Sequence, residues 1–186
     1  MIDSAKSAAT DPDSAAPAAG SATLASTVID SLTFARGGDQ IAGLVSLARL
    51  PRLVGDALAP EGGLAVELRG WRDEEGKSWL DLRIRGDMLT RCQRCLESLT
   101  LPLRIDSRLR LIAPGEAWPD DDLADDAADA IAADRAMDVL ALVEDEVLLA
   151  LPVAPLHARC ALPAAVDRTG ASPFAALAAL AALKTH

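Results

Sequence analysis

Four residues of the sequence carry side chains that zinc prefers as ligands. Cys92 and Cys95 stand at C-x-x-C spacing, in which the two intervening residues form a turn that brings both sulfurs to one point. His157 and Cys160 offer a second pair at H-x-x-C spacing, after Pro155. The two pairs would complete a Cys3His tetrahedron if the intervening chain returns the second pair to the first.

Two other interpretations of the cysteines stay open. Cysteine is often buried for packing alone, and roughly 60 residues separate the two pairs. A redox role for Cys92 and Cys95 would need a thioredoxin-like βαβ setting, which the sequence does not show. The chain has three cysteines, an odd number that fits a reducing compartment where thiols stay free or bind metal.

Three consecutive acids, Glu144, Asp145 and Glu146, could bind a divalent ion or act as general acid and base. Consecutive helical residues point about 100° apart, so these carboxylates would not converge, and we expect a solvated or partner-facing helix surface. No G-x-S-x-G, Gly-rich phosphate loop or H-E-x-x-H occurs, and one of the two histidines is the last residue. The sequence therefore predicts a protein that is not an enzyme.

The arginines offer the most direct route to RNA. Residues 69–110 contain ten Lys and Arg against seven acids, whereas residues 115–146 contain twelve acids and one arginine. Arg91, Arg94 and Arg104, near the C-x-x-C, could bind phosphates in a bidentate manner. They could equally lie on a wet strand face, their stems covering apolar surface. The acidic segment could instead mimic nucleic acid and hold a basic protein.

Apolar and polar residues alternate over much of residues 64–112, which predicts strands with one buried and one wet face. The apolar positions are Leu64, Val66 and Leu68, then Leu80, Leu82 and Ile84, then Leu101, Leu103 and Ile105, then Leu109 and Leu111. Residues 73–77 supply a hairpin turn, and Gly86-Asp87 predicts a further break. We therefore expect an α+β fold, with an antiparallel sheet or partly closed β-barrel packed with one or two helices.

Apolar positions 139, 140, 143, 147 and 151 form a helical stripe, with Asp138 as N-cap and Pro152 as the stop. A last helix is expected over residues 173–183, and a short helical piece over residues 46–50, ended by Pro51. Val28, Ile29, Leu32 and Phe34 could start a strand.

Residues 1–27 are almost entirely small or polar and are expected to be a disordered tail. The remaining residues, 28–186, are expected to form one domain with a loose acidic connection at residues 114–135.

The composition restricts the class of protein and its location. Hydrophobic residues make up 51% but aromatic residues only 3%, so the core must be aliphatic. The net charge of −10 repels polyphosphate and argues against a general nucleic-acid binder. No run of about 18 apolar residues is present to span a bilayer, and the N-terminus does not resemble a secretory signal. We expect a cytoplasmic protein.

Three stretches, in the expected order, resemble the YceD family, also called the large ribosomal RNA subunit accumulation proteins. They are Cys92-Gln93-Arg94-Cys95-Leu96, then Leu142 to His157 followed by Cys160, then Ser172-Pro173-Phe174-Ala175 with an Ala/Leu helix ending at Lys184. The long Ala-rich N-terminal segment departs from the family. So does the low aromatic content, which disfavours a surface that stacks RNA bases.

This resemblance implies a role in ribosome biogenesis, through the level or maturation of 23S ribosomal RNA, without recognised catalytic machinery. The expected partner is ribosomal RNA or an assembling large-subunit ribosomal protein, with no membrane and no DNA. Two alternatives remain. One is a zinc-stabilised interaction module with no ribosomal task, and the other is a thiol redox enzyme.

Overall fold

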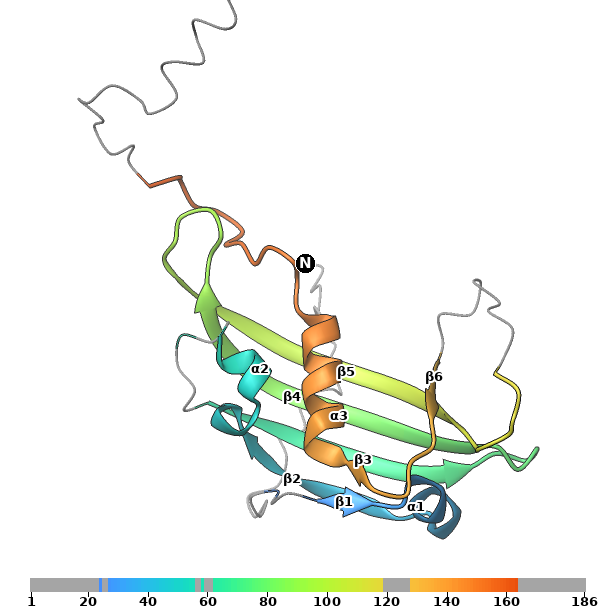
Figure 1. The fold of residues 1–186 in the computed structure, drawn as a ribbon. Helices are drawn as coiled ribbons and strands as arrows, with labels where there is room; N and C mark the ends of the chain where they lie inside the picture. The colour runs from blue at the N-terminus through green and yellow to red at the C-terminus, as the bar shows by residue number, and fades with distance from the viewer. Residues whose placement is uncertain (1–23, 25–26, 56–57, 59–61, 119–127, 164–186) are drawn as a thin grey trace, which may run out of the picture.

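A computed structural model of the 186-residue chain describes residues 24, 27–55, 58, 62–118 and 128–163. Five strands form the main sheet in the order β2-β3-β4-β5-β6 (Figure 1). They are β2 (Gln40–Ser46), β3 (Gly63–Arg72), β4 (Ser78–Arg91), β5 (Ser98–Ile112) and β6 (Asp129–Ala132). The first four pair antiparallel, and β6 joins β5 in parallel. The sheet is open, so the antiparallel-sheet prediction is confirmed and the partly closed barrel is wrong.

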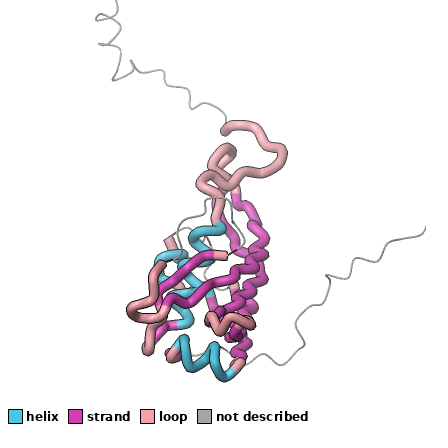
Figure 2. Tube along the Cα trace, turned by 90° about the vertical axis from the view of Figure 1, so that its right-hand side faces the viewer, coloured by secondary structure: helices cyan, strands magenta, loops and turns pink. Residues whose placement is uncertain are grey.

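The helices lie on one face of this sheet (Figures 1 and 2). They are α1 (Ser31–Gly37), the 3-10 turn η1 (Leu47–Arg49), α2 (Pro51–Val54) and α3 (Val139–Ala150). A second, two-stranded sheet pairs β1 (Val28–Ile29) with β7 (Met137–Asp138). Asp138 caps α3 as predicted, since its side chain accepts a 2.9 Å hydrogen bond from the Leu140 amide. No helix in the described part of the chain is long and apolar enough to span a membrane.

Strict alternation along the long strands separates an inner face from an outer face. Even-numbered residues of β3 and β4 and odd-numbered residues of β5 point inward, where most are buried. The inner residues pack with α1 and α3 into an aliphatic core, and Phe34 is the one aromatic residue among its buried members in the described part. The outer face carries charged residues and two tryptophans, and none of the described helices covers it.

Several expectations at the N-terminal side of the sheet are wrong. Leu32 and Phe34 belong to α1 rather than to a strand, because Asp30 caps its first turn and Gly38 ends it with φ 67°. The short helical piece expected at residues 46–50 is present as η1 and ends before Pro51. Pro51 itself begins α2, since a proline at the first helical position loses no hydrogen bond. Leu24, placed in the expected tail, is buried in the core.

Gly86-Asp87 does not break the sheet but lies inside the 14-residue β4. A Cβ on Gly86 would lie 2.8 Å from Leu64 Cδ2, so this glycine lets neighbouring chains approach closely. The two predicted strand runs after residue 100 are one 15-residue strand, β5. Within the expected loose connection, residues 129–132 form β6. The predicted helix at 173–183, most of the predicted tail and residues 119–127 lie outside the described residues.

Gly70 on the inner side of β3 is the point where α1 contacts the sheet. An alanine Cβ there would lie 2.7 Å from the Phe34 carbonyl oxygen and 2.8 Å from Ala35 Cα, both backbone atoms. We expect Gly70→Ala to lower the free energy of unfolding by about 1–3 kcal/mol, measured by urea denaturation. Gly63→Ala on the same strand is the control, because its nearest neighbour would be 3.6 Å away. Equal losses for both variants would contradict the proposed contact.

Candidate metal centre

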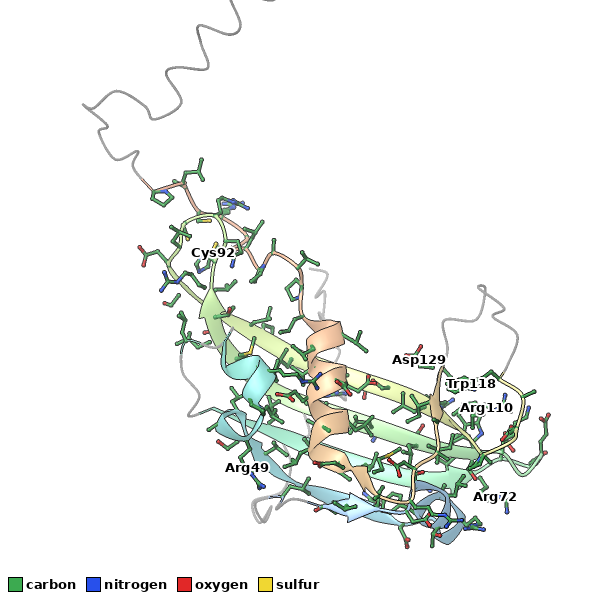
Figure 3. All side chains as sticks on the ribbon, viewed as in Figure 1. Arg49, Arg72, Cys92, Arg110, Trp118 and Asp129 are labelled. Atoms are coloured by element: carbon green, nitrogen blue, oxygen red, sulfur yellow. The ribbon has the colours of Figure 1, made fainter. Side chains whose placement is uncertain are left out.

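The β4–β5 hairpin ends in a tight loop that holds two of the candidate ligands. The Cys92 amide donates to the Glu97 carbonyl and the Leu96 amide donates to the Cys92 carbonyl, both at 2.9 Å. Leu96 adopts the left-handed conformation, with φ 65°, which turns the chain sharply back toward β5. This loop places Cys92 and Cys95 side by side at the tip of the hairpin. Figure 3 shows Cys92 at the end of the sheet opposite to Arg110 and Trp118.

The segment that follows α3 brings the other pair to this loop. The Gln93 amide donates a 2.9 Å hydrogen bond to the Pro155 carbonyl, which fixes the returning chain against the hairpin. As a result, one ligand atom from each of Cys92, Cys95, His157 and Cys160 lies within 4.8 Å of the others. The condition that the sequence left open, the return of the second pair to the first, is therefore met.

The spacing of the four ligand atoms suits a tetrahedral metal ion. Two sulfurs bound to one zinc at about 2.3 Å in tetrahedral geometry lie about 3.8 Å apart, and a sulfur and a nitrogen lie about 3.6 Å apart. The Cys92 and Cys160 sulfurs are 3.8 Å apart. The Cys95 sulfur and His157 Nδ1 are 3.3 Å apart. Small movements would place all four around one ion.

Neighbouring backbone groups prepare the ligands for a metal. His157 Nε2 lies 3.1 Å from the Ser98 carbonyl oxygen, so it can donate its proton there and leave Nδ1 free for the ion. Burial raises the pKa of the Cys92 thiol, but hydrogen bonds from the amides of Cys95, His157 and Arg94 outweigh burial and lower the pKa to about 5. The Cys92 thiolate that a metal requires is thus favoured at neutral pH.

Cys160 has the opposite tendency. Burial raises its pKa, and hydrogen bonds to the Cys92 and Cys95 sulfurs raise it further. One thiolate makes a neighbouring thiol harder to ionise, because two negative charges close together repel each other. A cation between the sulfurs would remove this repulsion. The chemistry of the donor set therefore fits a divalent cation.

The three candidate phosphate-binding arginines lie in different places. Arg94 sits beside the metal cluster, where its guanidinium is 3.4 Å from the Cys160 carbonyl oxygen. Arg91 is exposed at the end of β4, and Arg104 is exposed on the outer face of β5 opposite Arg85. Among the described residues, neither Arg91 nor Arg104 has an ion-pair partner.

The acidic triplet of α3 is largely turned inward, so the expected solvated helix surface is wrong for two of its members. Glu144 is 5% exposed and accepts hydrogen bonds from the Arg52 backbone amide at 2.6 Å and from the Arg52 Nε at 2.9 Å. Glu146 is 9% exposed and accepts a short hydrogen bond from the Ser107 hydroxyl. Asp145 remains half exposed and pairs with the Arg52 guanidinium at 2.5 Å.

The physical reason is the position of α3 over the inner face. The carboxylate of Glu144 caps the start of α2 and binds the same residue's guanidinium, so a buried charge is fully paired. Sequence reasoning missed Arg52, which is 92 residues away from Glu144 in the chain. It also missed the outer-face stack of Trp71 and Trp79, although their equal distances from the hairpin turn gave a signal.

Together the fold and the cluster define a small α+β protein with an open sheet and a Cys3His site at one end. A sequence model of the family described as large ribosomal RNA subunit accumulation protein YceD matches residues 80–183. The chain belongs to the YceD family, whose description indicates a ribosome-related role involving the large subunit. No curated protein and no solved structure matches the chain.

Glu144→Ala is expected to lower the free energy of unfolding by about 1–3 kcal/mol, because it removes the cap of α2 and the partner of Arg52. The loss should fall short of that for a fully buried pair, since the Arg52 side chain is 51% exposed. Asp145→Ala is the matched control. It removes an exposed pair with the same arginine and should cost less than about 1 kcal/mol in urea denaturation. A larger loss for Asp145→Ala than for Glu144→Ala would refute this assignment.

Proposed function

We propose that this protein is a non-enzymatic, cytoplasmic accessory factor of ribosome biogenesis that 23S ribosomal RNA needs in order to accumulate or mature. The observation that carries the proposal is membership of the YceD family, whose matched region includes most of β4, all of β5, α3 and the Cys3His cluster. The proposed mode of action is binding. In its support, two of the three carboxylates of α3 are engaged in contacts that stabilise the fold.

We further propose that the Cys3His cluster holds a structural zinc ion. The support is the 3.8 Å separation of two sulfurs, the depressed pKa of the Cys92 thiol and the Ser98 carbonyl behind His157. Four protein ligands would fill all positions of a tetrahedral ion and leave none open for a substrate, which favours a structural ion over a catalytic one. The ion would tie the chain after α3 to the tip of the β4–β5 hairpin.

The direct partner is proposed to be ribosomal RNA or an assembling large-subunit ribosomal protein. Crosslinking in cells, followed by recovery of the protein and identification of bound RNA and proteins, separates the two. RNA fragments crosslinked to the chain itself support the first partner. Recovery of one ribosomal protein after nuclease treatment supports the second.

Depleting the protein is expected to lower the amount of 23S ribosomal RNA relative to 16S ribosomal RNA, measured by electrophoresis of total RNA. The reason is that unstable assembly intermediates of the large subunit would be degraded. Expression of the intact chain should restore the ratio. An unchanged ratio in depleted cells would refute the ribosomal role. It would favour the alternative function, a zinc-stabilised interaction module without a ribosomal task. The convergence of the four ligands supports that alternative.

Purified protein is expected to contain about one zinc ion per chain by elemental analysis. Cys95→Ser and His157→Gln should each lower zinc occupancy at least tenfold and lower the melting temperature, because the ion links segments far apart in the chain. His186→Gln is the matched control, since it changes the other histidine and should keep full occupancy. Metal-free protein that melts at the same temperature as protein loaded with zinc would exclude a structural ion.

A further inference from the structure

The outer face of the sheet concentrates cations on a chain whose net charge is −10. We define the outer face as the outward positions of β3, β4 and β5 from residue 65 to residue 110. It carries seven arginines and four acids, which are Arg69, Arg83, Arg85, Arg91, Arg104, Arg108 and Arg110 together with Glu67, Asp81, Asp87 and Asp106. Positive charge therefore exceeds negative charge on this face, against the sign of the whole chain.

Ion pairs between strands engage most of the acids of this face and leave the excess positive charge on the remaining arginines. Asp81 accepts from Arg108 at 3.1 Å, and Asp106 accepts from Arg85 at 2.6 Å. Glu67 lies 4.0 Å from Arg83. By contrast, Arg69, Arg91 and Arg104 have no ion-pair partner among the described residues, although all three are exposed. Their guanidinium groups are free to bind anionic oxygens in a bidentate manner.

An aromatic pair stands at the end of this face away from the metal cluster. Trp71 and Trp79 face each other across β3 and β4, with ring centroids 5.6 Å apart and planes 12° apart. The Arg108 guanidinium lies 5.6 Å from the centroid of the Trp71 ring. Both indoles are partly exposed, so a flat ring could extend the stack.

We propose that the outer face binds single-stranded RNA, with bases stacking at the Trp71 and Trp79 pair and phosphates held by Arg69 and Arg104. This inference rests on the proposed function and selects RNA from its two proposed partners. The combination of unpaired arginines with a partly exposed indole stack favours single strands over duplexes, whose bases are already stacked and paired. An acidic protein would use the arginines but would have no need of the indoles.

The helical side of the sheet offers no comparable surface in the described part of the chain. The charged groups near α3 already pair with one another, since Arg52 binds two carboxylates of this helix. The three arginines of the outer face that lack partners come from three adjacent strands, so they follow the sheet rather than one loop. By register, Arg69 lies level with Asp81 and Arg104 lies level with Arg85, whereas Arg91 lies six residues further along β4. A strand of nucleotides that runs along the sheet from the Trp71 end would therefore meet Arg69 first, then Arg104 and last Arg91.

The test uses the purified full chain and a fluorescein-labelled, unstructured 12-nucleotide RNA, with binding followed by anisotropy at several salt concentrations. We expect the double variant Arg69→Gln with Arg104→Gln to weaken binding at least tenfold at low salt. It should also reduce the slope of log K against log salt by about 1.4, because two phosphate contacts are lost. Trp71→Leu should weaken binding by roughly tenfold with little change in slope. Trp71→Phe should restore part of the affinity.

Arg135→Gln is the matched control, because this exposed arginine precedes β7 and lies off the outer face. It should bind RNA as the unchanged chain does. Melting curves establish that each variant is folded. If Trp71→Leu does not fold, the double arginine variant decides alone, since both of its side chains are exposed.

Absence of RNA binding, or equal losses for the control and the double variant, would overturn the inference. So would tighter binding of a polyglutamate peptide than of the RNA at this face. These outcomes are distinct from failure of the proposed function. A lowered 23S to 16S ratio in depleted cells, combined with no RNA binding by the purified chain, would keep the ribosomal role and reject the outer face as its RNA-binding surface.

Discussion

The antiparallel pairing of β4 with β5 is the interaction on which the rest of the structure depends. It runs from Ser78 opposite Leu111 to Arg91 opposite Ser98 without a break. Because side chains alternate strictly along a strand, this one register decides which residues form the core and which form the outer face. It also carries the C-x-x-C loop beyond the ends of the other strands, to the point where the segment after α3 meets it (Figure 3). A shift by one residue would bury the arginines and expose the leucines.

The Glu144 contact acts at the middle of α3, and the proposed zinc ion acts on the chain beyond the end of this helix. Glu144 and Glu146 fix the helix to α2 and to β5, whereas the returning segment at residues 155–160 is held by the hairpin tip. The cluster joins residues 62 to 68 positions apart, and such a link constrains the unfolded chain more than a local contact does. The segment after α3 contributes few buried apolar side chains, and its Val153 and Leu162 are exposed. Packing alone therefore stabilises it little, and a bound metal would fix it in place.

The sequence predicted features that depend on local patterns. The alternation at residues 64–68, 80–84 and 101–111, the Asp138 cap and the hairpin turn at residues 73–77 all appear in the structure. The ligand types and spacings allowed His157 and Cys160 to meet Cys92 and Cys95 if the chain returned them to the hairpin, and the structure fulfils that condition. The burial of Glu144 was not, because it depends on Arg52, whose distance in the chain leaves no local signal. Gly86 was misread because a glycine that permits close strands looks like one that ends a strand.

The low aromatic content predicts no surface that stacks bases, but the structure brings two of the few aromatic residues together. Two of the three tryptophans lie side by side on one face, because both occupy odd positions next to the turn that joins β3 to β4. Apart from Arg72 at the end of β3, the arginines of β3 and β4 share that parity and those of β5 have the opposite parity, so antiparallel pairing collects them on the same side. The overall counts of tryptophan and arginine therefore understate how many of these residues the alternation of a strand places on one face. The excess of positive charge in residues 69–110 thus becomes a property of one sheet face, which extends from the tryptophan pair to Arg91 beside the thiol cluster.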